Sequence, residues 1–231
     1  MTPPSFKRHR FPPTIIRHCV WLYARFTLFY RDIEEMLAER GVDVSYETVR
    51  RWLLKFGPAI AANLGRSRPR PSDHWHLDEM VVKINGKRYW LWRAVDNEGE
   101  VLDFLVQTRR NAKTAKKLMK KLLKKQGFAP TRIVTDKLRS YRVAFRSLGL
   151  TAVHDRGLRA NNRAENSHLP LRRRERKQQG FTSPGSAQRF LAVLAANYNT
   201  FYHQRHLLSR TNDKDLRTGS FEAWASASAA V

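Results

Sequence analysis

Three acidic residues stand in segments that could gather carboxylates around a cation or a phosphate group. Asp78 lies within an apolar, strand-like run, Asp136 follows the β-branched run 132–135, and Glu165 lies in the polar segment 161–168. A charge inside an apolar strand is costly to bury without a partner, and a carboxylate at the end of a strand is presented at the rim of a sheet. Each acid alone fits an ordinary surface or salt-bridged carboxylate, so only their combined placement indicates a site.

The chemistry that such carboxylates favour is phosphoryl transfer assisted by metal ions. Oxygen ligands with water-filled gaps suit Mg²⁺, which retains several waters, and Mn²⁺ accepts the same kind of ligand. Two such ions about 3.5–4 Å apart activate an attacking oxygen and stabilise the leaving oxygen of an in-line displacement. The acids therefore predict a magnesium-dependent enzyme acting on phosphate esters, with Mn²⁺ as a substitute.

The net charge indicates the class of partner. The chain has 44 Lys and Arg against 20 Asp and Glu, a formal charge of +24, and this excess costs stability through self-repulsion unless a polyanion binds. We therefore expect a nucleic-acid-binding protein. A hydrophobic content of 42% is enough for a sizeable core, and the single Cys19 excludes an internal disulfide and a multi-cysteine zinc site.

Neither a membrane segment nor a secretion signal is expected. The longest apolar runs fall well short of the roughly 20 residues that a membrane-spanning helix needs. Residues 1–10 are basic but lack the apolar stretch of a signal peptide. We expect a cytoplasmic protein, located where nucleic acid is.

The N-terminal region has the pattern of a helix-turn-helix domain at 14–57. It follows a basic, proline-rich arm at 1–13, and apolar periodicity predicts three helices, at 14–30, 31–39 and 46–56. Gly41 marks the turn before the third helix, and Ser45 can cap that helix with its hydroxyl. Beyond it, Pro58 and a basic stretch with further prolines predict a linker at 58–72.

The third predicted helix is the one that would read DNA, because the second helix of a helix-turn-helix pair enters the major groove. Val49 and Leu53 are expected to be buried, which leaves Tyr46, Arg50 and Arg51 facing outward as candidate DNA contacts. The alternative is an ordinary helical hairpin. The large positive charge favours the DNA-binding interpretation.

The remainder of the chain carries strand and helix patterns in an order that resembles a known fold. Three strand-like runs, the first two joined by an Asn-Gly turn, predict an antiparallel meander. The predicted strands and helices, in chain order, are 74–84, 88–95, 101–108, 111–125, 133–136, 138–148, 151–154 and 161–177. This order resembles the ribonuclease-H-like fold, an α/β (α+β) architecture with a mixed five-stranded sheet, here at 73–208 after the small all-α domain. A last helix starts at Ser183-Pro184, and the tail at 209–231 is expected to fray.

Three motifs together resemble those of bacterial insertion-sequence transposases of the DDE class, of the IS-six family type. They are His-Leu-Asp-Glu at 76–79, Val-Thr-Asp-Lys at 134–137 and Asn-Asn-Arg-Ala-Glu-Asn-Ser-His at 161–168, followed by the basic run 172–176. The resemblance covers nearly the whole chain, and the ordered set is specific whereas each tetrapeptide is weak. It implies that Asp78, Asp136 and Glu165 are the catalytic, metal-binding triad. The interval of 29 positions from Asp136 to Glu165 is shorter than is usual in the wider class and looks like a short-loop variant.

The resemblance also implies contacts with DNA around the triad. Arg172, seven positions after Glu165, matches the basic position that holds a DNA phosphate from the same helix face. Lys137, Arg173 and Arg174 are expected to contact DNA as well. The implied enzyme uses Mg²⁺ to cut at the terminal inverted repeats of its element, and the released 3′-hydroxyl attacks target DNA. Holding two ends together implies a homodimer or higher oligomer, associated with the bacterial nucleoid.

Two other functions stay open: a non-catalytic DNA-binding repressor or decayed transposase, and a structure-specific nuclease of the same fold. The intact set of acids argues against the first, since a binder has no reason to keep like charges beside phosphate. Among the remaining acids, Glu79 alternates to the strand face opposite Asp78 and is a weaker candidate than the three acids of the triad. His76, His154 and His168 are candidates for supporting groups, with packing or contact with phosphate as the alternatives.

Overall fold

The computed structural model describes residues 4–136, 138–150, 152–155, 161–177, 181–203 and 207–229. In helix α6 (Asn162–Lys177) the backbone is described throughout, and the side chains are described except those of Asn162, Arg163, Glu165, Asn166, Ser167, Pro170 and Lys177. The chain forms two compact units, one from Met1–Arg68 with Ala192–Val231 and the other from Pro69–Leu191. The boundary falls within helix α7 (Pro184–Phe201), so one helix contributes to both units.

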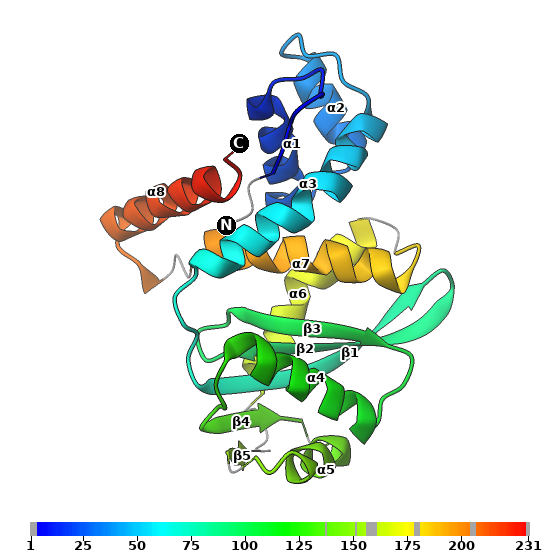
Figure 1. Ribbon diagram of the computed structural model, residues 1–231, viewed down its shortest axis with the longest axis vertical. Coiled ribbons are helices and arrows are strands. Elements are labelled where there is room, and N and C mark those ends of the chain that lie inside the picture. The colour runs from blue at the N-terminus through cyan, green and yellow to red at the C-terminus, as the bar shows by residue number, and fades with distance from the viewer. Residues whose placement is uncertain are drawn as a thin grey trace. The chain divides into compact units, whose positions relative to one another are not determined.

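The first unit is built from helices. It contains α1 (Pro13–Arg25), α2 (Tyr30–Ala38), α3 (Tyr46–Ser67) and α8 (Arg210–Ala227), with the last part of α7 (Figure 1). Helices α1, α2 and α8 all pack against α3. Helices α2 and α3, joined by a turn at Gly41 with φ of +71°, form the predicted two-helix pattern. Among the described residues, no helix is both long and apolar enough to cross a lipid bilayer.

Helix α1 ends earlier than predicted, at Arg25 rather than residue 30. The aromatic residues of 26–29 extend the apolar pattern, but two of them, Phe26 and Phe29, are exposed. The Asp32 carboxylate accepts the backbone N–H of Phe29 at 2.7 Å, which starts a new helix at Tyr30. A local cap therefore interrupts what the periodicity alone reads as one helix.

Helix α3 is longer than predicted, and the predicted end at residue 56 was wrong. The helix continues through Pro58 to Ser67. A proline inside a helix costs about 3 kcal/mol because one backbone hydrogen bond is lost. Beyond it, Ile60 and Leu64 are buried, and burial of each such side chain contributes about 1.5–3 kcal/mol. The buried apolar side chains therefore outweigh the proline.

The tail that was expected to fray is helix α8, so this prediction was also wrong. The Ser209 hydroxyl caps the helix by accepting the N–H of Asn212 at 3.2 Å. Trp224 and Ala227 are buried, and the Asn63 side chain of α3 donates a hydrogen bond to the Ala227 carbonyl at 3.0 Å. The buried Trp224 side chain and the buried hydrogen bond from the Asn63 amide therefore hold this segment in place, although its overall composition suggests disorder.

The second unit is built on a five-stranded sheet. Its strands lie in the order β3-β2-β1-β4-β5 and are β1 (His74–Ile84), β2 (Lys87–Asp96), β3 (Val101–Gln107), β4 (Arg132–Thr135) and β5 (Val153–Asp155). Strands β1, β2 and β3 form an antiparallel meander, whereas β4 runs parallel to β1 and β5 runs parallel to β4. The turn between β1 and β2 is formed by Asn85 and Gly86, both with positive φ, as predicted.

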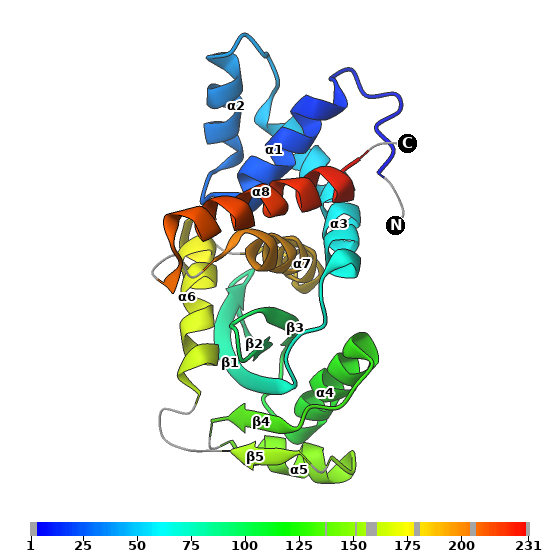
Figure 2. The same ribbon diagram turned by 90° about the vertical axis from the view of Figure 1, so that its left-hand side faces the viewer.

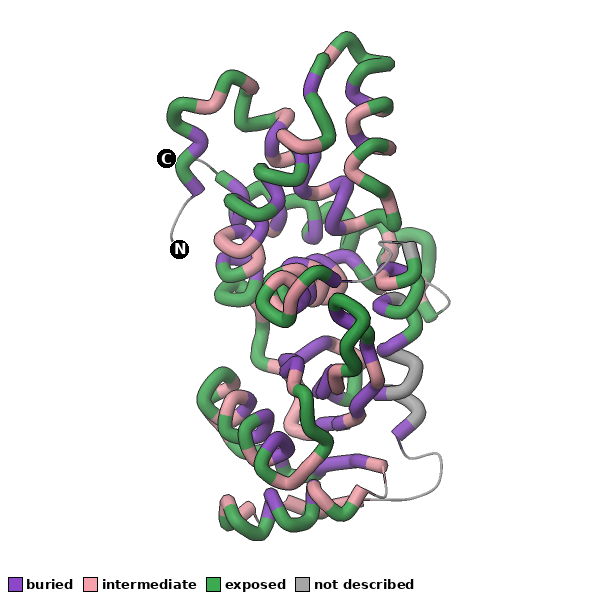
Figure 3. The backbone as a smooth tube through the Cα atoms, turned by 90° about the vertical axis from the view of Figure 1, so that its right-hand side faces the viewer, coloured by how far each residue is buried: buried purple, intermediate pink, exposed green. Residues whose placement is uncertain are grey.

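Helices cover both faces of this sheet. Helices α4 (Ala112–Gln126) and α5 (Arg139–Ser147) lie on one face, and α6 lies against β1 and β2 on the other (Figure 2). The core under α4 and α5 contains Trp75, Leu77, Trp92, Leu118, Met119 and Tyr141, all fully buried. Figure 3 shows such buried positions along the strands. This arrangement confirms the predicted fold class, a mixed ribonuclease-H-like sheet in an α+β architecture.

Candidate metal centre

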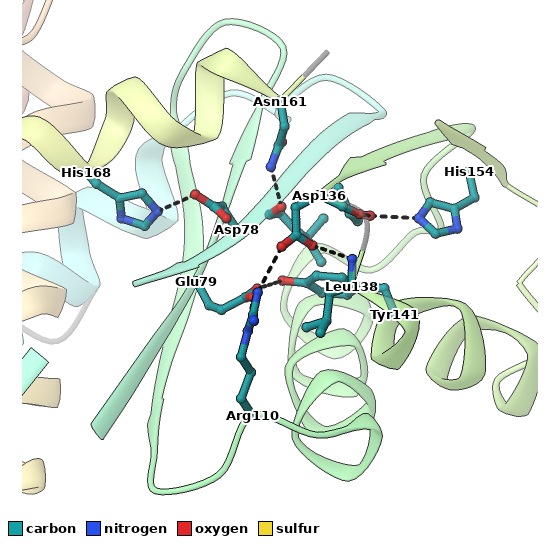
Figure 4. A network of polar contacts seen from close by, with 11 residues as sticks. Asp78, Glu79, Arg110, Asp136, Leu138, Tyr141, His154, Asn161 and His168 are labelled. Atoms are coloured by element: carbon teal, nitrogen blue, oxygen red, sulfur yellow. Dashed lines mark hydrogen bonds and ion pairs between the residues drawn. The ribbon is translucent and has the colours of Figure 1, made fainter. Parts of the chain in front are cut away.

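Two of the three predicted acids meet where the parallel strands β1 and β4 lie side by side. The register pairs Leu77 of β1 with Thr135 of β4, so the next residues, Asp78 and Asp136, leave the pair at the same end. Carboxylate oxygens of Asp78, Glu79 and Asp136 lie within 4.8 Å of one another (Figure 4). The structure thus brings Asp78 and Asp136 together and adds a third acid.

The third acid is Glu79, which lies on the strand face opposite Asp78, as predicted, and whose carboxylate nevertheless lies close to the other two. Asp78 and Glu79 do serve opposite faces of β1, since Asp78 contacts His168 of α6 and Glu79 contacts Tyr141 of α5. Strand β4 ends one residue before Asp136, however, and its pairing with β1 stops before Glu79. The glutamate side chain therefore extends past the end of β4 and reaches Asp136. Alternation along a strand describes the direction of Cβ, not the reach of a long side chain.

Glu79 is buried and held on both carboxylate oxygens. Its side chain is 0% exposed, the Tyr141 hydroxyl donates to Oε2 at 2.8 Å, and Arg110 forms an ion pair with Oε1. Burial is the largest influence on the pKa of Glu79 and raises it, and the negative charge of Asp136 adds to the rise. Hydrogen bonds from Tyr141 and Arg110 partly oppose it. The pKa of Tyr141 is raised well above its ordinary value, chiefly because the ring is fully buried.

We expect Tyr141→Phe to destabilise the protein by about 1–3 kcal/mol at pH 8, because a buried carboxylate oxygen loses its donor. The loss of unfolding free energy caused by this substitution should be smaller at pH 4.5 than at pH 8. Glu79 has a raised pKa in the folded state, so stability falls as pH rises from the ordinary glutamate value through this raised value. Removing the Tyr141 donor, which favours the ionised form, raises the pKa of Glu79 further and enlarges that fall. Urea unfolding at both pH values measures the difference.

Tyr202→Phe is the matched control for this substitution. Tyr202 is 54% exposed and stacks on Tyr198, so loss of its hydroxyl should leave the unfolding free energy nearly unchanged at either pH. An equal destabilisation of Tyr141→Phe at pH 4.5 and pH 8 would contradict the role of its hydroxyl as a donor to ionised Glu79.

Asp136 is more accessible than Glu79, with a side chain that is 32% exposed. Its Oδ1 accepts the backbone N–H of Leu138 at 3.0 Å, which turns the chain into α5, and its Oδ2 contacts Arg110 at 3.0 Å. The preceding Thr135 hydroxyl lies 2.8 Å from His154 Nε2 of β5. His154 therefore supports the end of β4 through Thr135.

Helix α6 is attached to β1 at two points on either side of Glu165. The Asn161 side-chain amide donates to the Leu77 carbonyl at 2.9 Å, and His168 Nε2 lies 3.1 Å from Asp78 Oδ2. His168 follows Glu165 by three positions in α6. The side chain of Glu165 lies outside the described residues. Among the predicted supporting histidines, His168 contacts an acid of the site. Asn161 belongs to the third sequence motif, but its tie to β1 was not predicted.

The basic residues of α6 divide into exposed and buried ones. Arg172 and Arg173 are exposed, and Arg172 lines an open groove of about 1140 Å³ that Glu79 also lines. Arg174 is only 2% exposed, with its guanidinium 5.8 Å from the ring centroid of Phe190. Its prediction as a DNA contact was therefore wrong, because the helix turns this position into the protein. The predicted contact Lys137 lies outside the described residues.

The predicted DNA contacts of the first unit lie at the start of α3. Tyr46 is 39% exposed, with the Arg31 guanidinium 5.0 Å from its ring centroid, and the Arg50 and Arg51 side chains are 45% and 74% exposed. Glu47 forms an ion pair with Arg50 at 2.6 Å and lies 3.7 Å from Arg51. Val49 and Leu53 are buried, as the periodicity predicts.

The donors at the acidic group fit a hard divalent cation. Three carboxylates supply oxygen ligands within reach of one another, as Mg²⁺ requires, and two of them are partly accessible. Soft ligands are not part of the group, and Cys19 is buried in the other unit. The group is therefore suited to a hard divalent cation and not to a zinc–thiolate centre.

Residues 72–204, more than half of the chain, match a family model named DDE_Tnp_IS240 and described as a DDE domain. The transposase for insertion sequence-like element IS431mec of Staphylococcus aureus (strain N315) is 37% identical to this chain over 139 residues. The transposase for insertion sequence element IS257 in transposon Tn4003 of Staphylococcus aureus is 35% identical over 139 residues. Each match covers 60% of this chain and 62% of the relative, so it spans less than two thirds of the length of those curated relatives.

Solved structures with similar folds include catalytic cores of integrases. The HTLV-2 integrase catalytic core domain in complex with magnesium (trimeric form) is similar over 68% of this chain and 99% of its own, with 13% identity and a TM-score of 0.42. The catalytic core domain of BIV integrase is similar over 58% of this chain and 86% of its own, with 20% identity and a TM-score of 0.40.

Proposed function

Since this chain belongs to the DDE-domain family of insertion-sequence transposases, we propose that it cuts DNA at the terminal inverted repeats of its own element and joins the released 3′-hydroxyl to target DNA. The observation that carries this proposal is the group of carboxylates from Asp78, Glu79 and Asp136 at the ends of adjacent strands. The net charge of +24 supports DNA as the substrate. Both chemical steps are direct displacements, so neither needs a covalent intermediate with the protein.

The metal-binding role belongs to Asp78, Asp136 and Glu165, with Glu79 as an adjoining carboxylate. Mg²⁺ bound there, or Mn²⁺ in its place, supplies the positive charge that activates an attacking oxygen and stabilises a leaving one. His168 orients Asp78 by its contact at 3.1 Å, and Asn161 ties the start of α6 to β1 at 2.9 Å. These two contacts support a location of Glu165 close to the strand that carries Asp78.

The phosphate backbone of the substrate is assigned to exposed arginines of α6. Arg172 is exposed in the groove that runs along β1 from Glu79, and its guanidinium is suited to hold a phosphate there. Arg173 and, from the sequence pattern, Lys137 add further positive charge. Two element ends that are cut and joined together require at least two copies of the enzyme, so the working form is a homodimer or higher oligomer. Because the proposed substrate is the DNA of a bacterial cell, we propose that the protein associates with that DNA.

Recognition of the inverted repeats is assigned to α2 and α3 of the first unit. Arg50→Ala should weaken binding to the repeats by about 1–3 kcal/mol if Arg50 contacts a base edge, and should relax the preference at that position. Arg66→Ala, at the far end of the same helix, is the control, since Arg66 is exposed there. Gel-shift titrations with repeat and unrelated duplexes measure both effects. An equal loss on unrelated DNA would make Arg50 a phosphate contact.

A strand-transfer assay tests the proposed function. Purified protein is incubated with a labelled duplex that carries the inverted repeat found beside its gene and with a plasmid target, either with Mg²⁺ or with chelator. A metal-dependent joined product is expected. Tight binding to the repeat without cutting would favour a repressor or decayed transposase, and cutting without joining would favour a structure-specific nuclease.

A further inference from the structure

An arginine of the described part of the chain, Arg110, contacts two acids of the site. Arg110 follows β3 and directly precedes Asn111, the N-cap of α4. Its Nε and Nη2 both contact Oε1 of Glu79, and Nη2 also lies 3.0 Å from Oδ2 of Asp136 (Figure 4). One guanidinium therefore bridges two of the three carboxylates.

The contact to Glu79 is the fixed part of this bridge. Glu79 is fully buried and its other oxygen is held by Tyr141, so it is an immobile anchor. The ring centroid of Trp90 lies 5.0 Å from the Arg110 guanidinium and supports it from β2. The contact to Asp136 is the more accessible part, because the Arg110 and Asp136 side chains are 36% and 32% exposed.

A cation at Asp136 would have to share the carboxylate with this arginine. Both oxygens of Asp136 already accept hydrogen bonds, Oδ1 from the Leu138 N–H and Oδ2 from Arg110. A neutral backbone N–H is compatible with a metal ion on the same carboxylate. A guanidinium is not equally compatible, because two positive charges a few ångströms apart repel each other.

We propose that Arg110 is a built-in counter-ion that takes the place of a divalent cation at Asp136, so that metal binding and the Arg110–Asp136 ion pair exclude each other. The ion pair keeps the acids together in the absence of metal. Metal binding moves Arg110 off Asp136 while Glu79 and Trp90 retain it, and the exchange sets the metal concentration at which the site fills. The inference rests on the proposed metal-binding role of Asp136 and concerns metal binding alone, without DNA.

Titration of the full chain with Mn²⁺, followed by the electron paramagnetic resonance signal of the free ion, tests the inference. Arg110→Gln should bind Mn²⁺ about tenfold more tightly than wild type, because the competing positive charge is gone. Arg109→Gln is the matched control: Arg109 is the exposed neighbour with the same charge, and this variant should stay within about twofold of wild type.

The outcomes separate this inference from the proposed function. Equal Mn²⁺ affinities of wild type and Arg110→Gln would overturn the inference and leave the metal-dependent function standing. If neither protein bound Mn²⁺, both the inference and the metal-dependent function would fall. Weaker binding by Arg110→Gln would also overturn the inference, since Arg110 would then support the metal site.

A second measurement uses the wild-type protein, because Arg110→Gln leaves the buried Glu79 without its ion pair and could fail to fold. Arginine-selective ¹⁵N NMR follows the guanidinium signals, with that of Arg110 assigned by its loss in Arg110→Lys. Saturation with Mg²⁺ should shift the Arg110 signal and leave that of Arg109 in place. An Arg110 signal unchanged at saturating Mg²⁺ would overturn the inference.

Discussion

Asp136→Asn is expected to reduce metal-dependent joining of inverted-repeat DNA by at least about 10³-fold. A bound metal ion contributes several kcal/mol to the stabilisation of a phosphoryl-transfer transition state, and each 1.36 kcal/mol corresponds to about tenfold in rate. Asparagine keeps the shape of the side chain, and its carbonyl oxygen can still accept the Leu138 N–H. It removes the negative charge on which a cation depends. The strand-transfer assay with wild type and variant in Mg²⁺ measures the effect.

Glu98→Gln is the control for the loss of one acidic charge. Glu98 is exposed in the turn after β2, and its substitution should leave joining within about twofold of wild type. Binding of Asp136→Asn to the inverted repeat should also persist, because this function is assigned to the other unit. Joining by Asp136→Asn within tenfold of wild type would remove Asp136 from the metal ligands.

Trp92→Ala is expected to cost about 3–5 kcal/mol of unfolding free energy, the largest stability effect that we predict. Trp92 lies in β2, is 0% exposed and is the cross-strand partner of Glu79 in β1. Its ring packs edge-on against the ring of Tyr141, with 5.5 Å between the ring centroids. The cavity would therefore loosen the tyrosine that holds Glu79. Urea unfolding followed by far-UV circular dichroism measures the loss.

Trp92→Phe separates the volume of this side chain from its polarity. The Trp92 indole N–H is buried and has no hydrogen-bond acceptor among the described residues, so its removal breaks no bond. The phenylalanine variant should therefore lose less than half of the free energy that the alanine variant loses. A loss below about 1 kcal/mol for Trp92→Ala would mean that the core refills the cavity.

The order of elements in the second unit could be predicted because local signals agree there with the tertiary structure. The Asn85-Gly86 turn, the Asn111 cap and the Gly127 left-handed residue each mark the end of an element. The strand runs between them have the apolar content of a buried sheet. The meeting of Asp78 and Asp136 follows from the same order, since β4 pairs in parallel with β1.

The parts that could not be predicted depend on contacts between segments far apart in the chain. Helix α3 continues past Pro58 because its last turns pack against α8, and α8 forms around Trp224 despite its Ala/Ser-rich sequence. Glu79 joins the site because β4 ends early, which no pattern within β1 reveals. Arg174 is hidden because its helix face turns toward Phe190. The periodicity of apolar residues describes one helix or strand at a time, so it gives no information about the distant segments that pack against it.

The discontinuity of the helical unit has a consequence for synthesis on the ribosome. The sheet unit is one continuous stretch, Pro69–Leu191, so it can fold as soon as it has emerged. The helical unit needs Ala192–Val231 to pack with Met1–Arg68. Its first three helices therefore cannot complete their packing until the whole sheet unit and the C-terminal segment have been translated. At about 5–20 residues per second this wait lasts on the order of ten seconds. During that time the nascent helices have no α8 to cover α3, and a fragment cut at residue 68 would remain in the same incomplete state.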